Sequence, residues 1–73
     1  MKAEELESIA YRDPFRPFAV RLRNGDRIEI KRSLRTTVWV DRVFFGVDED
    51  PATGVAKRMR IVSLAEIDSV EVS

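Results

Sequence analysis

Cysteine and histidine are both missing from this chain of 73 residues. Without cysteine the chain forms no disulfide, and zinc sites built mainly from cysteine and histidine are excluded. The missing histidine also removes the commonest general base. A core of this size is a poor place to desolvate and tune the remaining carboxylates, lysines and serines, so we expect no enzyme, no cofactor and no small-molecule substrate.

Long apolar runs are lacking as well. No run approaches the roughly 20 residues of a membrane span, and the first five residues, MKAEE, are too acidic for a signal peptide. These features predict a cytoplasmic protein with no membrane contact. An apolar fraction of 44% and a charged fraction of 36% predict one small folded domain over residues 1–73.

Charge is balanced overall but unevenly distributed. Residues 1–11 carry one base and three acids, residues 12–35 carry eight bases and three acids, and residues 36–73 carry four bases and seven acids. A basic middle between acidic ends indicates either an anion-binding face or segments that neutralise one another after folding. Mutual neutralisation is the commoner outcome.

A short helix is predicted over residues 2–11. Its apolar residues recur at spacings of three and four and form one stripe: Ala3, Leu6, Ile9 and Ala10. Asp13 ends it, because the residue before a proline avoids the α region. A helix of about ten residues is marginal alone in water, so we expect it to dock on the strands that follow.

Residues 14–18, PFRPF, form a stiff connector in which Phe15 and Phe18 are predicted to anchor the chain to the core. From Phe18 onward the apolar period becomes two, which predicts a hairpin around the Asn24-Gly25 step.

The alternation of apolar residues in the two strands decides the length of this turn. A two-residue loop would pair Arg21 with Ile28 and place the apolar residues of the two strands on opposite faces. A three-residue loop over residues 23–25 pairs Val20 with Ile28 instead, and it gives Gly25 the left-handed bulge position that glycine suits. We therefore predict the three-residue loop.

The outer face of this hairpin is rich in arginine. The three-residue loop sets Arg21 opposite Arg27, where like charges are destabilising unless Glu29, a bound anion or a partner's carboxylate bridges them. The candidate anion or nucleic-acid face consists of Arg21, Arg23, Arg27, Lys31 and Arg32. A solvated strand face is the more ordinary explanation of such alternation.

A second hairpin is predicted over residues 36–40 and 43–47, with its turn at Asp41-Arg42. One face carries Val38, Val40, Val43, Phe45 and Val47. The other face carries Trp39 and Phe44, so the hairpin is expected to be central or covered on both sides. These two aromatic residues are our candidate protein interface, unless the N-terminal helix covers them.

Residues 48–54 predict a solvated loop, and residues 57–63 predict a strand with Met59 and Ile61 turned inward. Residues 63–66 predict a tight turn or one helical turn, before a last strand that contains Ile67, Val70 and Val72.

The predicted fold is mainly β (α+β). An N-terminal helix precedes a strongly bent antiparallel sheet of five to six strands, or a small Sm-like or SH3-like barrel, with the helix over one open end. The predicted inner lining is Phe18, Val20, Ile28, Ile30, Val38, Phe45 and Ile61.

The chain resembles an uncharacterised family of short bacterial proteins over nearly its full length. The resemblance rests on the helix, the PFRPF segment at 14–18, the VRLRNGD strand and turn at 20–26, and the IVSLAEIDSVEV ending at 61–72. It implies no particular activity.

A looser likeness is to Sm-like proteins, which follow a helix with a bent five-stranded barrel, assemble into rings through edge strands and bind RNA. The arginine-glycine pair of the second Sm motif is not in this chain, so the likeness supports the barrel shape more than RNA binding.

Two functions follow as predictions. The first is protein interaction or self-assembly into an oligomer, through an edge strand and the aromatic pair Trp39 and Phe44. The alternative is binding of RNA or single-stranded nucleic acid through the arginine-rich first hairpin.

Overall fold

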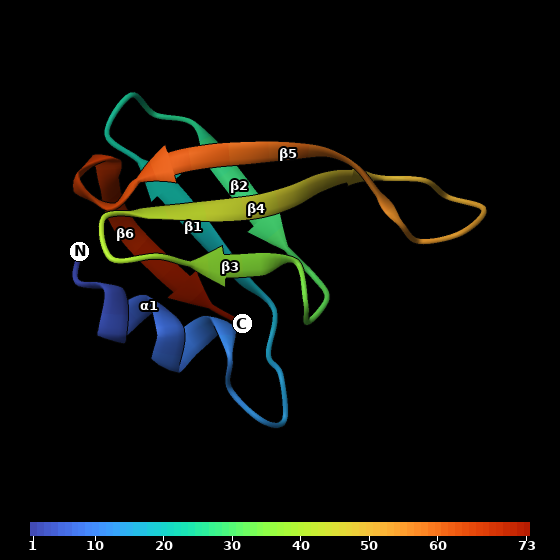
Figure 1. Cartoon of the computed structure of the whole chain (residues 1–73), viewed down its shortest axis with the longest axis horizontal. Helices are drawn as coiled ribbons and strands as arrows, with labels where there is room; N and C mark the ends of the chain where they lie inside the picture. Colours follow the sequence, from blue (N-terminus) through green and yellow to red (C-terminus); the bar gives the residue numbers. More distant parts are fainter.

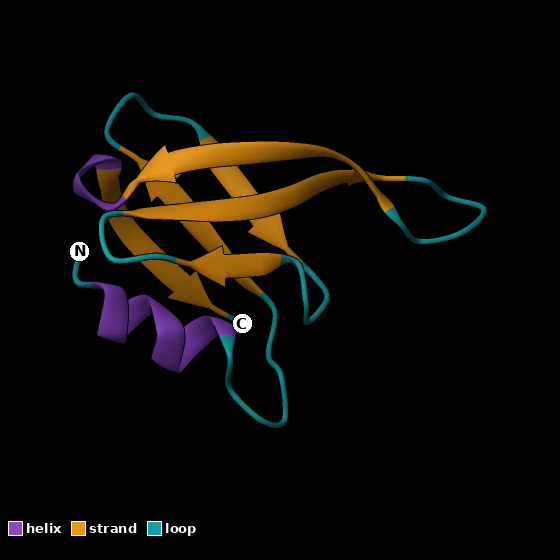
Figure 2. Ribbon diagram, viewed as in Figure 1, coloured by secondary structure: helices purple, strands orange, loops and turns teal.

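Six strands, one α-helix and one 3₁₀ turn make up the computed structural model, which describes residues 1–73 (Figures 1 and 2). The elements in chain order are α1 (Ala3–Ala10), β1 (Phe18–Leu22), β2 (Arg27–Ile30), β3 (Thr36–Val38), β4 (Arg42–Glu49), β5 (Ala56–Ser63), η1 (Leu64–Glu66) and β6 (Ile67–Val72). Two antiparallel three-stranded sheets result, with strand orders β2-β1-β6 and β3-β4-β5. The mainly β class with one N-terminal helix is confirmed.

The predicted barrel does not close. Figure 1 shows β3, β4 and β5 crossing in front of β2, β1 and β6, and no strand pairing joins the two sheets. The chain passes from one sheet to the other through residues 31–35, where Leu34 adopts a left-handed backbone with φ of 65°. This kink separates β2 from β3, so two packed sheets replace one continuous bent sheet.

The core lies between the two sheets and is completed by α1. Its buried apolar side chains are Leu6, Ala10, Phe18, Val20, Leu22, Ile28, Ile30, Val43, Phe45, Val62, Leu64 and Ile67. Five of the seven predicted lining residues are among them, and Val38 is partly buried against them. The prediction for Ile61 is wrong, because this side chain is 58% exposed.

The phase of β5 explains this error. Val62 pairs with buried Val43 and is itself buried, so Ile61 and Met59 must point to the other face. Ser63 caps η1 by accepting a hydrogen bond from the Ala65 amide, and the following Leu64 enters the core. The inward-facing residues of this segment are therefore the even-numbered ones.

The first hairpin has the predicted register. Val20 pairs with Ile28 and Phe18 with Ile30. Gly25 has a φ of 94°, a conformation that a side chain would strain. The three-residue loop is confirmed, and with it the placement of the first arginine pair on the outer face.

The turn of the second hairpin lies one residue earlier than predicted. The Trp39 amide donates to the Arg42 carbonyl at 2.8 Å, so the turn consists of Val40 and Asp41. Val40 is 88% exposed, and the prediction that it faces the core is wrong. Its place in the turn frees it from the alternation of the strand.

Part of the acidic segment that was predicted as a loop belongs to a strand. Asp48 and Glu49 belong to β4, which reaches eight residues, so the predicted loop over residues 48–54 is wrong at its start. Asp48 has a φ of 56°, which marks an irregularity before the strand ends.

The helix docks as its apolar stripe predicts. Leu6 and Ala10 are buried, and Ala3 and Ile9 pack against the core. The connector follows with the Phe15 and Phe18 rings 6.1 Å apart. None of the helices has the length and apolar character that a membrane crossing requires.

Candidate protein interface

Four apolar side chains gather on the outer face of the β3-β4-β5 sheet, and we call them the outer patch: Trp39, Phe44, Met59 and Ile61. The Trp39 and Phe44 rings stack at 5.1 Å between centroids. Phe44 pairs directly with Ile61 across the strands, and Met59 lies two residues from Ile61. The predicted placement of the two aromatic side chains on one face is confirmed, and two aliphatic side chains join them there.

The outer patch is open to solvent. Trp39 is 56% exposed, Met59 is 66% exposed, and only Phe44 is half-buried. The helix does not cover them, because its stripe packs into the core on the opposite side of the sheet. Exposed large side chains are common singly on protein surfaces, whereas a contiguous group of four makes this face a candidate contact surface.

The outer patch is continuous with an unpaired strand edge. β5 pairs only with β4, and backbone bonding alternates along an antiparallel strand. The Gly46 amide donates to the Arg35 carbonyl at 2.7 Å, so even-numbered residues of β4 bond toward β3 and odd-numbered ones toward β5. Met59 and Ile61, which pair with even-numbered residues, therefore direct their own N–H and C=O groups to the free edge.

The opposite edge of this sheet is occupied. The Val38 amide of β3 donates to the hydroxyl oxygen of Tyr11 at 2.8 Å. This bond blunts the β3 edge, which is a common protection against strand pairing. The contrast leaves β5 as the edge of this sheet that is open for pairing.

Charges border one end of the outer patch. Asp41 and Arg42 form a two-pronged ion pair, with Nε–Oδ1 at 3.0 Å and Nη2–Oδ2 at 3.1 Å. The hydrogen bonds from Arg42 hold the pKa of Asp41 below its usual range. Together with Ile61 and Ser63 the pair lines a shallow hollow of about 280 Å³ beside the aromatic stack.

The predicted arginine face is largely ion-paired. Arg21 lies opposite Arg27 as expected, and Glu71 of β6 bridges them, at 3.6 Å from Arg21 and 3.1 Å from Arg27. The hydrogen bond from Arg27 lowers the pKa of Glu71 and raises that of Arg27, and the opposite charges add to both shifts. Glu29 lies 3.5 Å from Arg27 as well.

Of the other three predicted cations, Lys31 adjoins this network through Glu29, which also neighbours Arg27. Lys31 Nζ lies 3.9 Å from Glu29, and Arg32 pairs with Glu49 at 3.1 Å, on the crossover side of the molecule. Arg23 is exposed in the turn. The fold thus brings acids to most of these cations, which is the neutralisation that the charge distribution indicated.

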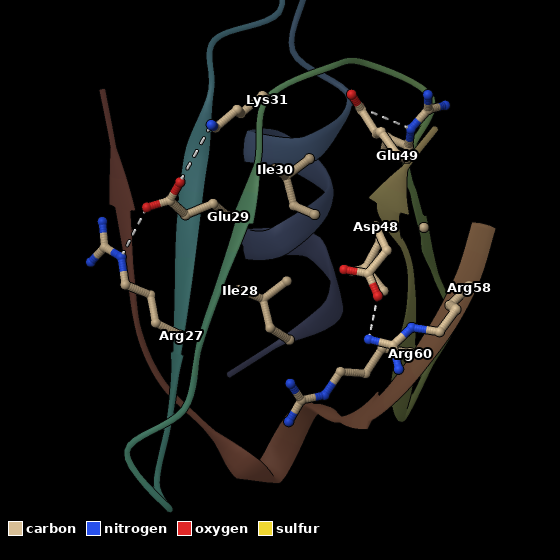
Figure 3. Close-up of a pocket in the computed structure, with 12 residues that line it drawn as sticks. Arg27, Ile28, Glu29, Ile30, Lys31, Asp48, Glu49, Arg58 and Arg60 are labelled. Atoms are coloured by element: carbon tan, nitrogen blue, oxygen red, sulfur yellow. Dashed lines mark ion pairs between the residues drawn. The ribbon is translucent and has the colours of Figure 1, made fainter. Parts of the chain in front are cut away.

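A cleft of about 440 Å³ separates β2 from β4 and β5 (Figure 3). Ile28 and Ile30 point into it, and its charged lining comprises Arg27, Glu29, Lys31, Arg35, Asp48, Glu49, Arg58 and Arg60. Ion pairs link the two sheets beside it, from Arg60 to Asp26 at 2.7 Å and from Arg32 to Glu49. Arg58 pairs with Asp48 along its wall.

Sequence reasoning missed Met59, Ile61, Arg58 and Arg60, because it assigned β5 the opposite phase. The segment contains adjacent apolar residues, Ile61 and Val62, so its alternation alone is ambiguous. The usable signal was the spacing of Val62 from Leu64, since the residue after the capping Ser63 enters the core.

Comparisons of the chain with protein-family models, curated proteins and solved structures give no match. The likeness to short bacterial proteins and to Sm-like proteins therefore stays a prediction from sequence. The geometry of the outer patch and of the β5 edge carries the functional argument alone.

Proposed function

We propose that this chain is a non-enzymatic protein-association module that binds through the outer patch and the free edge of β5. The observation that carries the proposal is the continuity of the two features. Met59 and Ile61 contribute both exposed apolar side chains and unpaired backbone groups. A partner that pairs with their backbone also buries its side chains against the patch.

The physical gains at such a surface are of two kinds. Strand addition satisfies backbone donors and acceptors along the edge, and alternate side chains provide selectivity. Aromatic residues supply large, rigid contact areas and are enriched among the residues that dominate binding energy. The Trp39 and Phe44 rings already contact each other, with centroids 5.1 Å apart and ring planes tilted by 38°, so part of their ordering cost is met before a partner binds.

Nucleic-acid binding through the arginine face is the weaker proposal. A phosphate at Arg21 or Arg27 would compete with Glu71, which already bridges both guanidinium groups. Favourable salt-dependent binding of a nucleic-acid backbone requires cations that release counterions, and ion-paired arginines release few.

The test compares three forms of the whole chain: the wild type, Ile61→Lys, and the control Leu34→Lys. Leu34 is 94% exposed, lies on the crossover between the sheets and is not part of the outer patch. Each form is sedimented over a dilution series and used to select from a displayed library of random peptides.

We expect the wild type and Leu34→Lys to associate, with a partner peptide or with a second copy, and Ile61→Lys to lose that association. A wild type that stays monomeric at every concentration and enriches no peptide contradicts the proposal. Association that survives in Ile61→Lys contradicts it as well.

A further inference from the structure

We propose that the β5 edge accepts an extended protein segment in which acidic and apolar residues alternate. This inference rests on the proposed function and specifies the partner. It draws on the side of β5 that faces the cleft, whereas the proposed function rests on the outer patch.

The two faces of β5 present different chemistry to a new neighbouring strand. Met59 and Ile61 point to the outer face, and Arg58 and Arg60 point to the inner face, where they line the cleft (Figure 3). A strand added at the free edge places its own side chains alternately beside these two pairs. Apolar residues fit on the outer side, and carboxylates fit on the inner side.

Arg58 and Arg60 supply the positive charge at this border of the cleft. Each already has one acidic neighbour, Asp48 for Arg58 and Asp26 at 2.7 Å for Arg60, so a carboxylate of the added strand would share these guanidinium groups with them. Arg58 is an exposed cation, with 72% of its side chain accessible beside Asp48. An added strand continues the inner face past Arg58 and Arg60 at the border of the cleft, where its carboxylates join an existing charge network.

A second copy of this chain is a poorer occupant of the edge in the two registers that pair Met59 with an apolar residue. With Ile61 opposite Ile61 no arginines meet, but Met59 then lies opposite Ser63. Antiparallel pairing of two β5 strands with Met59 opposite Met59 sets Arg58 against Arg60 twice. Pairing with Met59 opposite Ile61 sets Arg60 against Arg60. Like charges directly opposite each other are destabilising, so both registers that match Met59 with an apolar residue are disfavoured.

The test uses synthetic peptides and the whole chain, with binding measured by fluorescence anisotropy of the labelled peptide. The first peptide alternates glutamate and valine over eight residues. The second replaces each glutamate by lysine, and the third holds the glutamates and valines in two blocks. Two further peptides carry N-methyl groups on alternate amides of the first peptide, one on its glutamates and the other on its valines. N-methylation removes the hydrogen-bond donors that strand pairing needs and does not change the charge.

We expect the alternating acidic peptide to bind, and the lysine peptide to bind weaker by about tenfold or more, because its charges meet Arg58 and Arg60. The block peptide and at least one N-methylated form should lose binding. Arg58→Gln should weaken binding by about two- to fivefold, whereas the exposed connector variant Arg12→Gln, with the same change of charge, should leave it unaltered.

Equal binding of the acidic and lysine peptides, or binding that ignores both Arg58→Gln and N-methylation, overturns the inference. If library peptides bind at the outer patch without acidic alternation, the proposed function stands and this inference fails. If no peptide of either kind binds and the wild type stays monomeric, both fail. Displacement of the acidic peptide by a thymidine oligonucleotide that binds more tightly would instead assign the edge and cleft to phosphate.

Discussion

Glu71 partly neutralises a surface that appears basic in the sequence of the first hairpin. Arg21 and Arg27 are adjacent cations in the first hairpin, and sequence proximity alone suggests an anion site. The carboxylate that bridges them comes from β6, 44 residues further along than Arg27. Only the pairing of β1 with both β2 and β6 brings the three side chains together.

The bridge predicts a specific dependence of stability on pH. The pKa of Glu71 is lowered in the folded chain, mainly by the hydrogen bond from Arg27. Its contribution is therefore fully present above the unfolded pKa of about 4.3 and is lost as the pH falls through the lower, folded value. Glu71→Gln should flatten the acid side of the curve of melting temperature against pH.

The control for this experiment is Glu66→Gln, in which the altered carboxylate lies outside the cluster. Melting temperatures measured from neutral pH down to about pH 3 cover the titration of ordinary carboxylates. An acid limb in Glu71→Gln as steep as that of the wild type contradicts the assigned role of the bridge.

At the scale of elements, the first hairpin and β5 differ in whether the sequence pattern alone shows which face of the strand is buried. The first hairpin was predictable because strict alternation and one glycine fix a single register. In β5 the adjacent apolar residues Ile61 and Val62 allow either the odd-numbered or the even-numbered side chains to face the core. The pairing of β5 with β4 decides between the two. The side of the sheet on which the outer patch lies was therefore not readable from the segment itself.

Matched substitutions test this phase. Val62→Thr places a hydroxyl at a site that is only 3% exposed, and burial of an unpaired hydroxyl should lower the free energy of unfolding by about 1–3 kcal/mol. Ile61→Thr keeps the β-branched shape on the solvent side and should change it by less than about 0.5 kcal/mol. Urea denaturation of both variants gives the two values, and the reverse order would contradict the assigned phase.

The same limit applies to the crossover between the sheets. The period of two that begins at Phe18 predicts strands on either side of residues 31–35, but no pattern there indicates a left-handed Leu34. Two sheets and one barrel have the same inward-facing residues in their first hairpin. The core could thus be predicted largely correctly while the closure of the sheet could not.

At the scale of the whole molecule, one small core holds both sheets together. Phe45 is fully buried at its centre, and the neighbouring Phe44 points outward. A domain of this size has a net stability of only roughly 3–5 kcal/mol, and truncation of a buried phenylalanine costs about the same.

Phe45→Ala should therefore abolish the cooperative thermal transition, followed by circular dichroism. Phe44→Ala on the same strand should retain that transition and melt at a lower temperature. A cooperative melt of Phe45→Ala within a few degrees of the wild type would show that the two sheets do not depend on this shared core.

Whether the edge of β5 is free can be observed directly by amide hydrogen exchange of the whole chain, measured by NMR. The amides of Arg60 and Val62, which bond to β4, should be protected, while those of Met59 and Ile61 should exchange rapidly. Addition of the alternating acidic peptide should then protect Met59 and Ile61. Slow exchange at these two amides in the free chain would contradict the account, because the edge would already be paired.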